Sequence, residues 1–184
     1  MFTNVNLQMY TFVLQIFLMT SEQLTDLYNS LKEKSLFGRY ITNKIIEGLL
    51  DNFSSVFQFS TIGYSVEHRP IFSLKVGQGD TKILLWSQMH GNESTTTKAL
   101  FDVLNGFSKG KFSDILENCT LQIIPILNPD GAARYTRVNA NNVDLNRDAV
   151  NRVAKESNLL RDTLEEFNPQ FCFNLHDQRT IFGV

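Results

Sequence analysis

Residues 82–104 read KILLWSQMHGNESTTTKALFDVL, which combines the signals of a buried strand, a tight turn and a helix. The apolar run Ile83–Trp86 predicts the strand, and Ser94 with Thr95 predicts the start of the helix. His90 and Glu93 fall three residues apart at the corner between these elements, where two polar side chains can converge on one point. A histidine nitrogen and a carboxylate at a strand's C-terminal edge are suitable zinc ligands, although such a pair alone is a weak signal.

A third candidate ligand follows another apolar run. Phe171–Leu175 predicts a short buried strand, and His176 comes directly after it. Because ligands lie at the carboxyl ends of parallel strands, we expect His90, Glu93 and His176 to come together. Two histidines and one glutamate leave a fourth position for water, as in catalytic zinc sites, so the sequence predicts one zinc ion per chain. The remaining histidine, His68, lies on a polar turn, and we expect it to be exposed rather than a ligand.

Composition favours one domain with a substantial core. The chain has 184 residues, 42% of them hydrophobic, which is enough for such a core. Seventeen basic and nineteen acidic residues give a net charge of −2, with no basic run. Nucleic acid and anionic membrane surfaces are therefore not expected partners. Cys119 and Cys172 lie in apolar runs, and we expect two buried thiols rather than a disulfide.

Residues 1–18 differ from the rest of the chain, because they are uncharged and largely apolar. They lack the positive start and the small-residue cleavage site of a signal peptide, and they are short for a membrane span. Residues 20–23, TSEQ, form a good helix start, so we favour a true beginning at Met19 over a signal peptide. We therefore predict a single domain over residues 19–184, located in the cytoplasm, with no membrane partner.

The remaining patterns outline an α/β domain. Helical spacing marks residues 21–35, 40–53 and 151–167. Period-two alternation over Phe57–Val76 predicts two antiparallel strands, which suggests an antiparallel edge on a mixed sheet. Leu121–Leu127 predicts a further buried strand, and the turn signal NPDG at 128–131 ends it.

The polar stretch over residues 132–151 has no clean period, and such a long loop in a compact domain is uncommon unless it is functional. Within it, Arg137 can stabilise an oxyanion formed on a carbonyl. Asn146 and Arg147 can hold a substrate carboxylate, the arginine through a two-pronged pair. The alternative is a solvated loop whose arginines form salt bridges with nearby aspartates, namely Asp130, Asp144 and Asp148.

Several motifs in order resemble the zinc carboxypeptidase family, peptidase family M14. They are HGNE at 90–93, NPDG at 128–131, RVNANNVDLNRD at 137–148 and the strand before His176, and the resemblance spans roughly Glu67–Asp177. It implies an α/β fold, a three-layer α/β/α sandwich around a mixed, mostly parallel sheet. It also implies roles for six residues: His90, Glu93 and His176 as zinc ligands, Arg137 as carbonyl polariser, and Asn146 with Arg147 as the carboxylate clamp. Asp177 either orients a ligand or is an exposed loop residue.

The function implied is a zinc-dependent metallocarboxypeptidase. Such an enzyme hydrolyses the C-terminal bond of peptides with a free C-terminal carboxylate, through a metal-activated water. Members of the family take their general-base glutamate, and a tyrosine that closes over the substrate, from sequence well beyond the third ligand. Only eight residues follow His176, so the expectation is a domain truncated after its metal site, without that base. The alternatives are a deacylase-type or cell-wall-peptide amidohydrolase of the same superfamily, or a catalytically incomplete zinc-binding fragment.

Overall fold

The computed structural model describes residues 19–53 and 56–177, and the predicted leader at 1–18 lies outside this part. The chain divides into two compact units, Met1–Lys32 and Glu33–Val184. In the first unit, helix α2 (Ser21–Leu31) begins at a capping box, in which Thr20 and Gln23 each bond the other's backbone N–H. The predicted helix start is therefore confirmed. None of the helices in the described residues is long and apolar enough to span a membrane.

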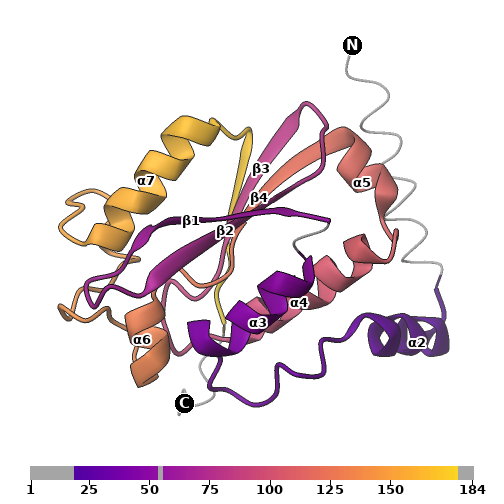
Figure 1. Ribbon diagram of the computed structural model, residues 1–184, viewed down its shortest axis with the longest axis horizontal. Coiled ribbons are helices and arrows are strands. Elements are labelled where there is room, and N and C mark those ends of the chain that lie inside the picture. The colour runs from indigo at the N-terminus through magenta and orange to yellow at the C-terminus, as the bar shows by residue number, and fades with distance from the viewer. Residues whose placement is uncertain (1–18, 54–55, 178–184) are drawn as a thin grey trace. The chain divides into compact units, whose positions relative to one another are not determined.

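The second unit contains a sheet of five described strands in the order β1-β2-β4-β3-β5 (Figure 1). Strands β1 and β2 form an antiparallel pair, and β2 is also antiparallel to β4. Strand β3 pairs in parallel with both β4 and β5. Four strands thus run in one direction and β2 alone opposes them, as expected for a mixed sheet with an antiparallel edge. The strands are β1 (Gln58–Tyr64), β2 (Pro70–Val76), β3 (Thr81–Trp86), β4 (Cys119–Ile124) and β5 (Phe171–Asn174).

The helices of this unit are α3 (Asn43–Phe53), α4 (Thr95–Ser108), α5 (Ser113–Asn118), α6 (Pro129–Arg134) and α7 (Lys155–Phe167). Sequence patterns did not predict α5, which is a single short element between α4 and β4. The NPDG motif starts α6 instead of forming only a turn. Asn128 caps α6 by accepting a hydrogen bond from the Gly131 N–H at 2.8 Å, and Pro129 occupies its first position.

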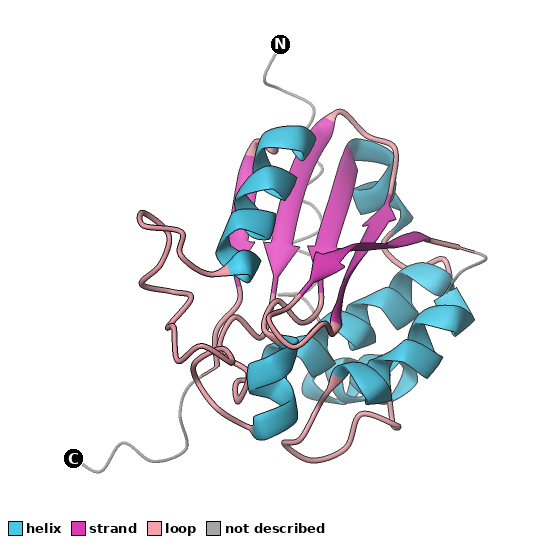
Figure 2. Cartoon of the chain, turned by 60° about the vertical axis from the view of Figure 1, so that its left-hand side comes forward, coloured by secondary structure: helices cyan, strands magenta, loops and turns pink. Residues whose placement is uncertain are grey.

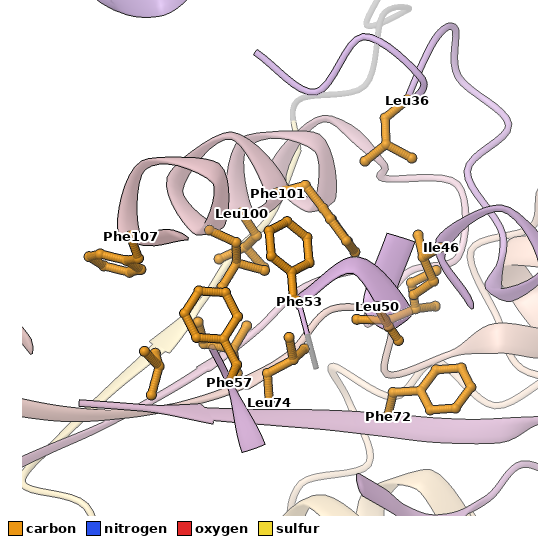
Figure 3. Packing of buried hydrophobic residues seen from close by; sticks show 14 of the residues in the cluster. Leu36, Ile46, Leu50, Phe53, Phe57, Phe72, Leu74, Leu100, Phe101 and Phe107 are labelled. Atoms are coloured by element: carbon orange, nitrogen blue, oxygen red, sulfur yellow. The ribbon is translucent and has the colours of Figure 1, made fainter. Parts of the chain in front are cut away.

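Side chains alternate between the two faces of the sheet and build two cores. On one face, Leu74 and Ile123 pack with residues of α3 and α4. Phe53 of α3 packs against Phe101 of α4, with 6.1 Å between the ring centroids (Figure 3). On the other face, Ile124 packs in a smaller cluster that includes Leu159 and Leu160 of α7. Figures 1 and 2 show α7 across the sheet from α3 and α4. The unit is therefore a three-layer α/β/α arrangement.

Strand β5 is the outermost described strand on its side of the sheet, and it is poorly covered. Phe171 is 56% exposed and Phe173 is 49% exposed. Cys172 is exposed and Cys119 is half-buried, and both thiols are free. The expectation of two buried thiols is therefore wrong for Cys172, because an apolar strand at the edge of the sheet is not covered as a central strand is.

Candidate metal centre

The three predicted ligands meet at the carboxyl ends of two neighbouring strands. His90 and Glu93 lie in the turn after β3, and His176 follows β5. These strands are parallel, with Trp86 opposite Asn174, and the Leu175 N–H extends the pairing to the Trp86 carbonyl at 2.9 Å. Both histidines therefore leave the sheet at the same edge.

The Glu93 carboxylate lies between two imidazole rings. Its Oε1 is 2.8 Å from His90 Nδ1, and its Oε2 is 2.9 Å from His176 Nδ1. One ligand atom from each of these three residues lies within 4.8 Å of the others. His90 and Glu93 are buried, whereas the His176 side chain is 33% exposed, so the cluster is reachable from one side. This group can hold a metal ion.

Asp144 holds the far side of the His90 ring. Its Oδ1 is 3.1 Å from His90 Nε2, and its Oδ2 accepts a hydrogen bond from Arg137 Nε at 2.9 Å. A carboxylate bonded to one ring nitrogen fixes the orientation of a histidine and leaves the other nitrogen available to a metal ion. Sequence patterns indicated Asp144 only as a salt-bridge partner of a loop arginine. Its place two residues before Asn146, in the same motif, was the available signal.

Arg137 points toward the three predicted ligands. Its guanidinium Nη1 lies 3.1 Å from His90 Nδ1 and 3.5 Å from Glu93 Oε1. The pair between Arg137 and Asp144 also matches the salt-bridge alternative for this loop. The other two aspartates of that alternative bond elsewhere: Asp130 bonds Arg69, and Asp148 accepts hydrogen bonds from the backbone N–H groups of Val153 and Ala154.

Asn146 and Arg147 are both close in sequence to Asp144, but they differ in their surroundings. Asn146 is half-buried, with its Oδ1 3.5 Å from Asn174 Nδ2. Arg147 is exposed, and no described residue bonds its guanidinium. Asn146 therefore lies beside a residue of β5 that is two positions before His176, while Arg147 presents a charge to solvent.

Asp177 contacts the cluster through its backbone. Its N–H donates to Glu93 Oε2 at 3.2 Å, and its carboxylate Oδ2 accepts from the Thr95 N–H at 3.1 Å. The Ser94 hydroxyl donates instead to the Arg39 carbonyl, so Asp177 caps α4 in place of the residue before it. The Asp177 carboxylate therefore bonds Thr95 and no predicted ligand, and the residue is half-buried, so neither of the two roles considered for its side chain is confirmed. His68 is exposed and lies outside the cluster.

A buried amide supports the turn between the first two ligands. Gln88 Nε2 donates to the carbonyls of Gly91 at 2.8 Å and Ile41 at 3.0 Å. Its Oε1 accepts from the Thr97 hydroxyl at 2.7 Å. Gln88 is fully buried and has a positive φ of 44°. Through these three hydrogen bonds its side chain connects the turn, α4 and the segment before α3. No local sequence pattern indicated this role.

The electrostatics of the site lower the pKa of two carboxyl groups, those of Glu93 and Asp144. Burial alone would raise the pKa of Glu93, but hydrogen bonds from His176, the Asp177 N–H and His90 bring it below its usual value. Burial likewise opposes ionisation of Asp144, but Arg137 and His90 lower the pKa of that carboxyl overall. An ionised carboxylate is the form that binds a metal cation.

Comparison with known proteins gives a consistent match. A family model described as zinc carboxypeptidase matches residues 42–173. The curated protein carboxypeptidase SOL1 from Arabidopsis thaliana is 32% identical over 124 residues, which cover 59% of this chain and 25% of that protein. Carboxypeptidase D from Rattus norvegicus is 29% identical over 119 residues, 58% of this chain and 8% of that protein. The chain thus matches a quarter or less of the length of these relatives.

Solved structures match the fold. A metallo-carboxypeptidase from Burkholderia cenocepacia superposes with a TM-score of 0.67 at 21% identity, over 75% of this chain and 41% of that one. Carboxypeptidase A from Helicoverpa armigera gives a TM-score of 0.64 at 20% identity, over 86% of this chain and 54% of that one. At these identities the likeness concerns the arrangement of the sheet and its helices.

Proposed function

Since this chain belongs to the zinc carboxypeptidase family, we propose that His90, Glu93 and His176 bind one zinc ion of a metallocarboxypeptidase. The proposed reaction is hydrolysis of the C-terminal peptide bond of a peptide with a free C-terminal carboxylate. The observation that supports it is the position of the Glu93 carboxylate, which lies 2.8 Å and 2.9 Å from the Nδ1 atoms of the two histidines.

The donor atoms suit a zinc ion. Zinc binds imidazole nitrogen and carboxylate oxygen, and catalytic sites use three such protein ligands with a further position open. Asp144 contacts His90 Nε2, which leaves Nδ1 of the same ring directed at the cluster. Glu93 has a lowered pKa and is therefore in the charge state that the ion requires. When bound, zinc supplies a Lewis acid that polarises a carbonyl and lowers the pKa of water.

Arg137 is proposed to bind the carbonyl oxygen of the scissile peptide bond. Asp144 holds its Nε, so the guanidinium is oriented with Nη1 toward the cluster. Hydrogen-bond donors fixed in this way stabilise the negative charge that develops on the carbonyl oxygen during hydrolysis. The orientation needs no rearrangement when substrate binds, because Asp144 already provides it.

Asn146 and Arg147 are proposed to bind the terminal carboxylate of the substrate. The Asn146 Oδ1 faces Asn174 Nδ2, so its own Nδ2 is the group left to donate. The Arg147 guanidinium is exposed and bonds no described residue, which makes it available for a two-pronged, charge-assisted pair with a carboxylate. Together they would place the last peptide bond of the substrate next to Arg137 and the metal ligands.

A second candidate function is a zinc- and carboxylate-binding unit without hydrolytic activity of its own. Each carboxylate of the site among the described residues already has partners: Glu93 bonds both histidines, Asp144 bonds Arg137 and His90, and Asp177 caps α4. None of these three is free to accept a proton from water. This observation favours a unit whose described residues bind zinc and a carboxylate without supplying a general base.

Binding to a matched pair of peptides tests the proposal. The purified chain, loaded with zinc, is titrated with a short peptide and with the same peptide as its C-terminal amide. We expect zinc-dependent binding of the free carboxylate and weak binding of the amide. Equal binding of both peptides would contradict the carboxylate clamp, and failure to retain zinc would contradict the metal site.

A further inference from the structure

Glu156, in the first turn of α7, is a fully buried carboxylate without a described cationic partner. Its Oε1 accepts a hydrogen bond from the Val66 N–H at 3.3 Å, and its Oε2 accepts one from Asn139 Nδ2 at 3.0 Å. A buried carboxylate is unfavourable unless its oxygens are hydrogen-bonded. Glu156 therefore occupies a position at which two donors from other parts of the chain meet.

Asn139 connects Glu156 to the polar loop of the site. Its side chain is nearly fully buried, and its Oδ1 accepts from the backbone N–H groups of Asn141 and Val143, both at 3.0 Å. Its own N–H donates to the Val143 carbonyl, and its carbonyl accepts from the Asn142 N–H. Asn142 has a positive φ of 60°. Asn139 thus folds residues 139–143 into one tight turn.

This turn leads directly into the residues of the site. Asp144 follows it at once, and Asp144 contacts both His90 and Arg137. The Asn146 N–H donates to Asp144 Oδ1 at 3.0 Å, so the start of the proposed clamp depends on the same carboxylate. Any shift of the turn would therefore move the contact to the metal ligand and the clamp together.

We propose that Glu156 is a positioning residue, which acts through Asn139 to fix the loop that carries Asp144, Asn146 and Arg147. It touches none of the proposed ligands or substrate-binding groups itself. The contact between Glu156 and Asn139 is called the anchor below. Because this role presupposes the proposed function, its test must separate a failure of the metal site from a failure of the anchor. The chemistry at position 156 allows that separation.

Both partners of Glu156 are donors, so position 156 must present two acceptors. Glu156→Gln keeps the shape but places an NH2 group against either the Val66 N–H or Asn139 Nδ2. Asn139→Asp replaces the donor at position 139 with an acceptor, so that two carboxylate oxygens then face each other. Combining the two substitutions restores complementarity: the new amide at 156 donates to the new carboxylate at 139 and still accepts from Val66. The combination also leaves the net charge unchanged.

Cobalt(II) binding and amide hydrogen exchange provide the readouts. Titrating the purified chain with Co²⁺ gives an affinity and a visible spectrum that reports ligand geometry, while exchange at residues 139–147 reports loop order in the absence of metal. We expect each single variant to weaken Co²⁺ affinity by about tenfold, as for groups that orient ligands, to alter the spectrum, and to speed exchange in the loop. The double variant should recover most of the Co²⁺ affinity and of the loop order that each single variant loses, since the effects of substitutions at residues bonded to each other are not additive.

Glu165→Gln serves as the matched control, because Glu165 is an exposed residue of the same helix and, in the part of the chain that the structure describes, pairs only with Arg161. It should leave affinity, spectrum and loop exchange as in the unmodified chain. A loss of stability alone would lower the unfolding temperature without changing the Co²⁺ spectrum.

Unchanged affinity, spectrum and loop exchange in Glu156→Gln would overturn the inference. So would a double variant whose losses equal the sum of the two single losses. If Glu156→Gln does not fold, the double variant decides: near-native affinity supports the anchor, and a folded protein with weak affinity refutes it. An unmodified chain that binds no Co²⁺ would contradict the proposed function instead, and the exchange rates would still test the anchor.

Discussion

The backbone of Gly91 lies directly against that of Gly131, so that a methyl group on Gly91 would sit 2.0 Å from the Gly131 carbonyl carbon. Gly91 belongs to the turn between His90 and Glu93, and Gly131 lies in α6. The HGNE and NPDG motifs are thus in backbone contact, and only glycine at 91 permits this separation. The contact places α6, with Arg137 just beyond it, next to the proposed metal ligands.

Replacing Gly91 tests this contact. Gly91→Ala should lower the free energy of unfolding by about 3 kcal/mol, the upper end of the range for an added carbon in a packed site, because backbone atoms cannot move aside as a flexible side chain can. Gly48→Ala is the control, since nothing lies within 4 Å of the added methyl group in α3. It should raise stability by about 0.4–1 kcal/mol through the helix preference of alanine. Urea denaturation measures both, and equal stability of the two variants would refute the contact.

Asp144→Asn should weaken zinc binding although no ligand is changed. The amide has one acceptor oxygen, so it cannot bond both His90 Nε2 and Arg137 Nε as the carboxylate does. We expect the zinc dissociation constant to rise by about 10–100-fold, as for other residues that orient a histidine ligand. Competition with a chromophoric chelator measures the change. Asp162→Asn, at an exposed position on α7, should leave the affinity unaltered, and equal affinity of both variants would argue against Asp144.

Arg147→Ala should affect peptide binding but not metal binding or folding. Its guanidinium has no described partner to lose, so the free energy of unfolding should stay the same. Binding of a peptide with a free C-terminal carboxylate should weaken by about 1.5–3 kcal/mol, the range for a hydrogen bond to a charged group. Calorimetric titration measures this, with the corresponding peptide amide as the control ligand. A variant that binds the free peptide normally would remove Arg147 from the clamp.

Asp148 should make stability depend on pH. Burial alone would raise its pKa, but hydrogen bonds from the Ala154 and Val153 N–H groups lower it below the usual value. A lowered pKa in the folded state means that Asp148 stabilises the fold above its unfolded pKa of about 3.9. This contribution is lost as pH falls through the lower, folded value.

Asp148→Asn removes that contribution, because its amide leaves one of the two N–H groups without an acceptor. At neutral pH the variant should be less stable by about 1–3 kcal/mol, and the difference should shrink below about pH 4. Urea denaturation at several pH values measures this difference. A difference that stays constant down to pH 2 would show that the carboxylate charge is not involved.

The meeting of the proposed metal ligands was predictable because the signal is local: a polar residue directly after an apolar run. Two such runs form parallel neighbours in the sheet, so His90 and His176 meet where expected. Gln88 and Glu156 were not predictable in the same way. Their roles depend on partners distant in sequence, such as the bond from Asn139 to Glu156 and the one from Gln88 to Ile41. A residue's own neighbourhood in sequence does not show such partners.

The misread elements have physical reasons too. NPDG carries both turn and helix-start signals. The cap by Asn128 and Pro129 at the first helical position favour the short helix α6 over a simple turn. Helix α5 spans only six residues, too few to show a helical period. Cys172 lies in an apolar run, as a central strand would, but exposure depends on the neighbours of a strand in the sheet and not on its own sequence.

The zinc content of the purified chain tests the central claim most directly. We expect about one zinc per chain, a lower content in His176→Ala, and none in a variant with His90, Glu93 and His176 all replaced by alanine. His68→Ala is the matched control, because it removes an exposed histidine outside the cluster and should leave the content at that of the unmodified chain. Zinc content that does not change in the triple variant would show that these residues are not the metal site.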